Sequence, residues 1–87
     1  DFGPTLVNAG GVLNAMGRHQ EALPHFERAM VVKPGDPGIR FSLGVTYLSL
    51  ERHDEAREQL QQALTEVGDT SDNLNHQIEA ALESLSG

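Results

Sequence analysis

The sequence predicts an all-α protein, an α–α superhelix of two antiparallel helical hairpins followed by a C-terminal capping helix. A shift of 34 residues superimposes much of the 87-residue chain on itself. Turn-forming residues recur at matching places in the two copies, and no segment alternates polar and apolar residues as a β-strand does. We therefore expect helices at about residues 4–16, 20–32, 37–50, 54–67 and 71–85.

The repeat is defined by positions that keep their size and polarity after the shift. Small residues fall on small residues and large apolar residues on large ones: Gly10 on Gly44, Leu13 on Tyr47, Ala22 on Ala56, Phe26 on Leu60 and Ala29 on Ala63. Small residues let two antiparallel helices approach closely, and larger residues fill the space on either side. This indicates a single domain over residues 1–87, with repeat 1 at about 3–36, repeat 2 at about 37–70 and a capping helix at about 71–87.

Helix start and stop signals agree with these boundaries. Asp36 followed by Pro37 is typical of an N-cap and a first helical position. Asp54 is expected to cap the second helix of repeat 2. Gly17 marks the turn inside the first hairpin, and Gly68 marks the turn after the second.

These spacings resemble the tetratricopeptide repeat family, whose pattern runs from an aromatic residue through Leu-Gly and Tyr to Ala, Phe and Pro. The first copy carries Leu6, Ala9-Gly10, Leu13, Ala22, Phe26 and Pro34 at those places, and the second carries Leu43-Gly44, Tyr47, Ala56 and Leu60. The aromatic place departs from the family pattern, because it holds Leu6 in one copy and Arg40 in the other. We expect Ile39 or the aliphatic stem of Arg40 to fill that place in the second copy.

The last segment begins like a third copy and then stops. Its apolar residues form one stripe at helical spacing: Leu74, Ile78, Ala81, Leu82 and Leu85. A stack of repeats must end in an element with a polar outer face, so this helix is predicted to be a cap. Together the repeats and the cap predict a core of Leu6, Leu13, Ala22, Phe26, Ala29, Leu43, Tyr47, Ala56, Leu60, Ala63, Leu74, Ile78 and Leu82.

Charge and composition argue against several classes of partner. The formal net charge is −7, with 13 acidic residues against 6 Lys and Arg residues that are scattered singly. Phosphate groups are bound by clustered Lys and Arg, so we expect no nucleic acid and no membrane surface as partner. No apolar run approaches the roughly 20 residues of a membrane span.

The sequence offers no catalytic or metal-binding constellation. Cysteine is absent, which excludes disulfides and thiolate ligands. No nucleophile elbow or phosphate loop is present. His19 and His53 fall at equivalent turns, about one helix spacing of 8–10 Å apart, and we expect both to be exposed rather than to share an ion. We predict no catalytic residue, no metal and no cofactor, and a protein that is not an enzyme.

The resemblance implies a concave surface lined by the first helix of each repeat, which in this family binds protein or peptide partners. The helix at 37–50 carries a second apolar stripe, Phe41, Val45 and Leu48, beside the one assigned to the core. The predicted partner-binding groove comprises Val7, Gly11, Asn14, Phe41, Val45, Leu48, Asn75, His76 and Glu79. The Lys and Arg with which relatives hold a C-terminal carboxylate are missing from these places, so the predicted contacts are apolar with an acidic rim.

Three interpretations of the second stripe remain open. A peptide or protein segment binds it; or the capping helix covers it; or it belongs to a longer array of repeats or to a homodimer, in which another chain segment covers it.

Overall fold

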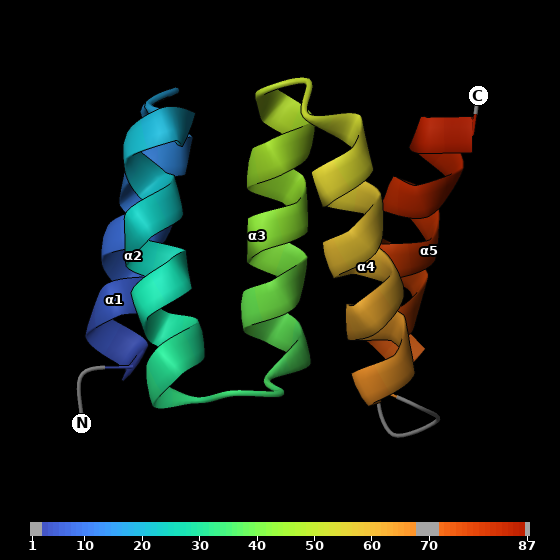
Figure 1. The fold of residues 1–87 in the computed structure, drawn as a ribbon, viewed down its shortest axis with the longest axis horizontal. Coiled ribbons are helices and arrows are strands. Elements are labelled where there is room, and N and C mark those ends of the chain that lie inside the picture. Colours follow the sequence, from blue (N-terminus) through green and yellow to red (C-terminus); the bar gives the residue numbers. More distant parts are fainter. Residues whose placement is uncertain (1–2, 68–71, 87) are drawn as a thin grey trace.

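Five helices form the part of the chain that the computed structural model describes, residues 3–67 and 72–86. They are α1 (Gly3–Ala15), α2 (His19–Val32), α3 (Pro37–Ser49), α4 (His53–Val67) and α5 (Asp72–Ser86) (Figure 1). No described residue lies in a β-strand, so the predicted all-α class is confirmed. Each helix end differs from its predicted position by no more than one residue. The turn predicted at Gly68 lies outside the described residues.

The helices pair in chain order. α1 packs antiparallel on α2 to form hairpin 1, and α3 packs antiparallel on α4 to form hairpin 2 (Figure 1). α2 lies against α3, which joins the hairpins, and α5 lies against α4. Among the described residues, α3 also touches both α1 and α5, whereas no residue of α1 approaches α5 within 8 Å between Cα atoms. The result is a row of helices in which α3 is central.

Local hydrogen bonds explain where the helices begin and end. Asp36 Oδ1 accepts from the backbone N–H groups of Gly38, at 2.9 Å, and Ile39, at 3.3 Å, which confirms the predicted N-cap of α3. The cap predicted at Asp54 is wrong, because α4 begins at His53 and Asp54 lies within its first turn. Asp54 Oδ1 lies 3.5 Å from Arg57 Nη1. An acidic residue there is favoured by the positive end of the helix dipole.

The turn within each hairpin has the same geometry. The backbone N–H of Arg18 donates to the Leu13 carbonyl at 2.8 Å, and the N–H of Arg52 donates to the Tyr47 carbonyl at 2.9 Å. Both turns pass through a left-handed residue, Gly17 with φ 80° and Glu51 with φ 60°. A bond of this kind over five residues closes a Schellman motif, which requires the left-handed position. Hairpin 2 therefore places a glutamate where hairpin 1 places the residue best suited to that backbone.

The two helices of each hairpin meet at a glycine. A Cβ added to Gly10 would lie 2.7 Å from Cζ of Phe26, and a Cβ added to Gly44 would lie 2.7 Å from Cγ of Leu60. Carbon atoms attract best at about 3.5–4.0 Å, so neither position has room for a side chain. This confirms the close approach that the repeat predicted.

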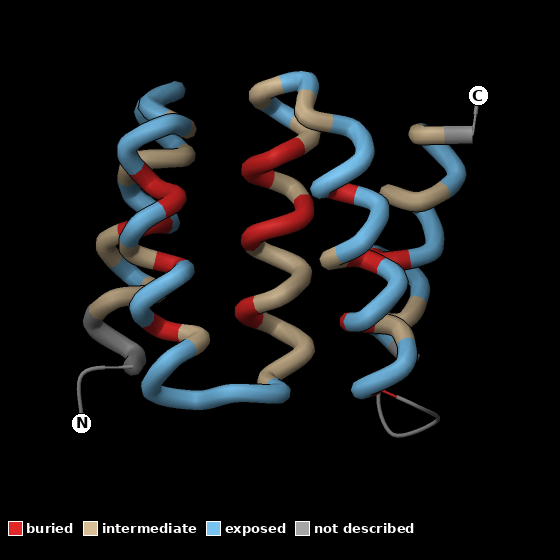
Figure 2. Tube along the Cα trace, in the orientation of Figure 1, coloured by how far each residue is buried: buried red, intermediate tan, exposed pale blue. Residues whose placement is uncertain are grey.

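The core is a band of buried residues running between the helix layers (Figure 2). Most residues of the predicted core are buried: Ala22, Phe26, Ala29, Leu43, Tyr47, Ala56, Leu60, Ala63 and Ile78. Leu13, Leu74 and Leu82 are partly buried and pack against the band. Leu6 is an exception, because it is only partly buried and lines an open hollow at the end of hairpin 1.

The place equivalent to Leu6 in hairpin 2 is polar. Arg40 Nε donates to both carboxylate oxygens of Glu66 at 2.8 Å, and its Nη1 donates to Gln59 Oε1 at 3.1 Å. The Arg40 and Glu66 side chains are 18% and 23% exposed. Ile39, the other residue expected to fill the aromatic place, is buried.

Candidate functional site

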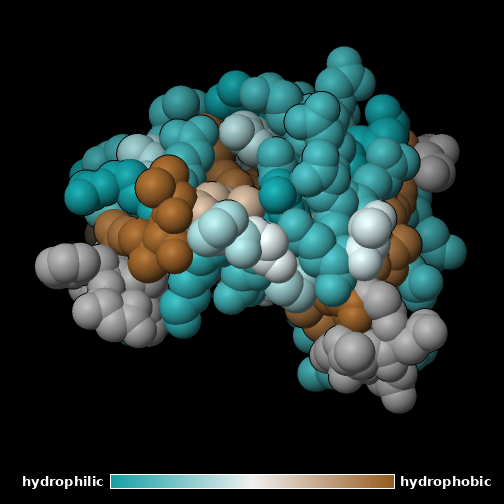
Figure 3. Space-filling view, turned by 60° about the horizontal axis from the view of Figure 1, so that its bottom comes forward, coloured by the Kyte–Doolittle hydropathy of each residue, from teal (hydrophilic) through white to brown (hydrophobic). Residues whose placement is uncertain are grey.

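The candidate binding surface is the concave side of the helix row. α1, α3 and α5 lie on this side, with α3 in contact with both of the others. Figure 3 shows the molecule from the end where α1 and α3 begin: its lower margin is hollowed between the N-terminal hairpin and the pair α4–α5. A concave surface of this kind can hold an extended segment across several helices.

The second apolar stripe lies on α3, at the centre of the concave layer. Phe41, Val45 and Leu48 are all partly buried. Phe41 and Leu48 pack against the cluster that α4 and α5 share, so part of the stripe is covered within the chain. Val45 belongs to neither core cluster, so it is the member of the stripe to which these clusters assign no packing role.

The α1 residues of the predicted groove differ in their surroundings. Val7 packs against the cluster centred on Phe26, and Gly11 is exposed. Asn14 is held in a hydrogen-bond network, because its Nδ2 donates to Thr46 Oγ1 at 2.8 Å. Thr46 is fully buried and its hydroxyl donates to the Ser42 carbonyl at 2.7 Å. The Asn14 amide therefore ties hairpin 1 to α3 rather than projecting freely.

This network also corrects the expectation for His19. The imidazole was expected to be exposed at the turn, but it is partly buried and its Nδ1 lies 2.8 Å from Asn14 Oδ1. Because the Asn14 amide nitrogen is engaged by Thr46, its oxygen is the acceptor, and His19 carries a hydrogen on Nδ1. The equivalent His53 is exposed, as expected.

The α5 residues of the predicted groove lie at one margin of the concave layer. Asn75 is partly buried, whereas His76 and Glu79 are exposed. Glu79 is therefore free to give this margin the acidic character that the sequence predicted.

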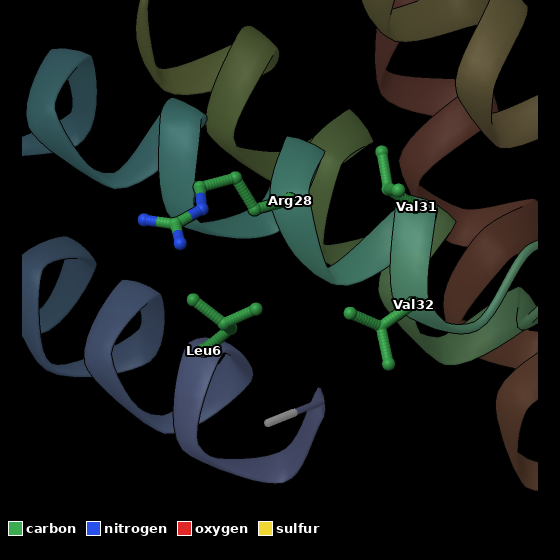
Figure 4. Close-up of a pocket in the computed structure, with 4 residues that line it drawn as sticks. All are labelled: Leu6, Arg28, Val31 and Val32. Carbon is green, nitrogen blue, oxygen red and sulfur yellow. The ribbon is translucent and has the colours of Figure 1, made fainter. Parts of the chain in front are cut away.

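A second apolar surface, which the sequence-based interpretation missed, lies on hairpin 1. The large apolar residues that are exposed in the described part of the chain all belong to this hairpin: Val12, Met16, Val31 and Val32. Val31 and Val32 line a hollow of about 280 Å³ together with Leu6 and Arg28. In Figure 4, Leu6 of α1 and Val32 of α2 point toward one another across this hollow, and the later helices lie behind. One sequence signal pointed to it: no residue from Gly3 to Ala15 is charged.

The titratable groups do not gather into a reactive centre in the described ranges. No group of three or more His, Asp or Glu side chains that is suited to a metal ion lies within residues 3–67 and 72–86. Burial raises the pKa of the Tyr47 hydroxyl above its ordinary value, so this group stays protonated at neutral pH. The Arg52 guanidinium lies over the same ring, 4.9 Å from its centroid, in a cation–π arrangement that stabilises the turn.

None of the helices in the described part of the chain is both long enough and apolar enough to cross a lipid bilayer.

Comparison with known proteins agrees with the internal repeat. A search of curated protein sequences finds no match to the chain. The sequence model described as "Tetratricopeptide repeat" matches residues 1–65, which include both hairpins up to the last turn of α4. Domains of this family generally mediate protein–protein interaction and are typically non-catalytic scaffolds. The chain belongs to the tetratricopeptide repeat family.

Proposed function

We propose that this protein is a non-catalytic scaffold that binds a peptide or protein segment on its concave surface. The observation that carries the proposal is Val45, a partly buried apolar residue at the centre of α3 that neither core cluster includes. It lies between Phe41 and Leu48 in the same stripe. When an apolar side chain of a partner packs against Val45, the contacting surfaces of both side chains are removed from water, which favours binding.

The charge of the surface favours a particular kind of segment. α1 has no charged residue, and Glu79 is exposed on α5 at the margin of the concave layer. The whole chain carries a formal net charge of −7. A segment with apolar residues flanked by Lys or Arg is therefore favoured over one flanked by acidic residues, through long-range attraction that salt screens.

The test compares two sets of labelled synthetic peptides with the same apolar centre, one flanked by Lys and the other by Glu. Fluorescence anisotropy should show tighter binding of the Lys-flanked set, and the difference should shrink at high salt. Val45→Lys should weaken binding of the Lys-flanked set by tenfold or more (about 1.4 kcal/mol), because it removes apolar surface and adds a like charge.

A matched control separates this effect from a change of net charge. Gln61 is exposed on α4, so Gln61→Lys makes the same change of net charge away from the concave layer and should lower affinity little. Phe41 is a poorer test position, because it packs against the α4–α5 cluster and its replacement would also destabilise the fold. Equal binding by Val45→Lys and the unmodified protein would refute the concave site.

A further inference from the structure

One side of hairpin 1 is more exposed than the equivalent side of hairpin 2: Val12 and Met16 are exposed, whereas Thr46 is buried and Leu50 is partly buried. The 34-residue shift places Ala9 and Val12 of α1 on Leu43 and Thr46 of α3. It also places Met16, which directly follows α1, on Leu50, the C-cap of α3. Leu43 is 4% exposed and Thr46 is 0% exposed, because hairpin 1 packs on that side of α3. Val12 and Met16 are 58% and 60% exposed. We call Ala9, Val12 and Met16 the α1 edge.

The geometry of the two hairpins supports this equivalence. Their turns share the same backbone hydrogen bond and the same left-handed position, at Gly17 and Glu51. Their helices cross at equivalent glycines, Gly10 and Gly44. α1 and α3 are therefore equivalent helices of the two repeats. The side of α3 that corresponds to the α1 edge is covered by hairpin 1, so the α1 edge is suited to being covered by another helix.

The composition of α1 also indicates a covered helix. None of its residues from Gly3 to Ala15 is acidic or basic, in a chain with a formal net charge of −7. A helix without charged side chains has no strongly hydrated face, which suits packing against another element. Of the described residues, only α2 and part of α3 contact α1, so its remaining side is available.

The hollow of hairpin 1 lies beside the same helix. Leu6 lies on α1, ten residues before Met16, which directly follows the helix, so the two are about 15 Å apart along the helix axis. The hollow has a volume of about 280 Å³ and is lined by apolar side chains apart from Arg28. In Figure 4 the hollow lies between α1 and α2.

We propose that the α1 edge is a self-association surface, on which a second copy of this chain packs with its own α1 edge about a two-fold axis. If the two α1 helices run antiparallel with the axis midway between Ala9 and Val12, each Val12 faces the small Ala9 of the other copy. Met16 of each copy then reaches the hollow beside Leu6 of the other, where its flexible side chain suits an irregular gap. Contacts of this kind are reciprocal, as a two-fold interface requires.

The rest of the molecule makes a second copy the best occupant. The edge is uncharged, so two chains with a net charge of −7 meet where their repulsion is weakest. The exposed residues of α5 that the structure describes are polar, apart from Ala80, so the opposite end of the row does not match the edge. A face of one helix is small compared with a standard interface of about 800 Å² per partner, so we expect a weak dimer.

Sedimentation velocity from about 10 µM to about 1 mM, the range for weak interfaces, tests the proposal on the unmodified chain. We expect the mass to rise toward that of a dimer across this range. Met16→Glu and Val12→Glu should each weaken association by tenfold or more, because a carboxylate would be buried without a partner. Ala80→Glu, which adds the same charge on α5, should leave association unchanged. Circular dichroism of each variant checks that it is folded.

Cysteine cross-linking tests the geometry, since the chain has no cysteine of its own. In an equimolar mixture of Ala9→Cys and Val12→Cys chains, the disulfide between the two different chains should exceed the twofold excess over each disulfide between like chains that random pairing gives. A product ratio of 1:2:1 would overturn the antiparallel arrangement.

Other results would overturn the proposal as a whole. The proposal is wrong if sedimentation shows a monomer at every concentration, or if Met16→Glu dimerises as strongly as the unmodified chain. A monomeric chain that gains stability when residues 3–36 are duplicated in front of Gly3 would show that the edge takes a hairpin of the same polypeptide instead. The inference does not rest on the proposed peptide site, because Val45→Lys should leave association intact.

Discussion

Gly10 and Gly11 are neighbours in α1, yet their replacement by alanine should have opposite effects. At Gly11 an added Cβ has no atom within 4 Å, and the residue is exposed. Alanine there gains helix propensity of about 0.8–1.0 kcal/mol over glycine. At Gly10 the same Cβ would lie 2.7 Å from Phe26 Cζ, 2.8 Å from Cε1 and 2.9 Å from Cε2.

The cost at Gly10 follows from the burial of Phe26. The ring is 1% exposed, so it cannot swing outward to restore carbon–carbon contacts of about 3.5–4.0 Å. Overpacking of this kind costs about 1–3 kcal/mol. Both variants gain the same propensity, so the difference between their free energies of unfolding isolates the overpacking. Gly10→Ala should therefore be about 1–3 kcal/mol less stable than Gly11→Ala.

Urea denaturation followed by far-UV circular dichroism measures this difference, at a protein concentration low enough that self-association does not contribute. Thermal melts give a second readout, with a shift of about 4–8 °C for each kcal/mol in a domain of this size. Gly44→Ala repeats the test in hairpin 2 and should cost at least as much, because the added Cβ would lie 2.7 Å from the branched Cγ of Leu60. The reasoning is refuted if Gly10→Ala is as stable as Gly11→Ala.

Three further changes probe the turn, the network between the hairpins and the cap. Glu51→Gly should raise the free energy of unfolding by about 1 kcal/mol, because φ is 60° there, and a lower melting temperature would contradict this. Thr46→Val leaves the Asn14 amide without its acceptor and should cost about 1–3 kcal/mol in denaturant titration; a neutral result would remove the network from the stability of the fold. Deleting residues 71–87 uncovers the cluster that α5 shares with α4 and should cause aggregation or loss of cooperative unfolding, whereas a truncated monomer with an unchanged melting temperature would exclude a capping role.

The helix boundaries followed from the sequence because they depend on short-range chemistry. The Asp36-Pro37 pair and the glycine at the hairpin 1 turn act through bonds over a few residues, so their residue types identify them. Glu51 shows where this reasoning fails. Its backbone is left-handed, with φ 60°, and glutamate is a residue type that normally avoids this conformation, so the residue type does not indicate it.

The sequence pattern could not predict the polar contacts between the hairpins. Thr46 is polar and yet fully buried, because Asn14 and the Ser42 carbonyl satisfy its hydroxyl. Asn14 lies 32 residues away from Thr46 along the chain, and helical periodicity carries no information on which polar groups meet over that separation. The same network places His19 partly inside the fold, although its position at a turn predicted exposure.

The sequence by itself determined the repeat unit of this protein, the order of its helices and the small residues at which they cross. Those features are set by residue size and spacing within each hairpin, as Gly10 and Gly44 show. Only the tertiary structure decided which apolar faces are covered. Helical spacing shows which residues share a face, but it does not show which element packs against that face. Phe41 and Leu48 lie against the α4–α5 cluster, whereas Val12 is 58% exposed and its equivalent Thr46 is 0% exposed. These two positions belong to the same place in the repeat, and their burial differs because α3 has a hairpin on that side and α1 has none within the described chain.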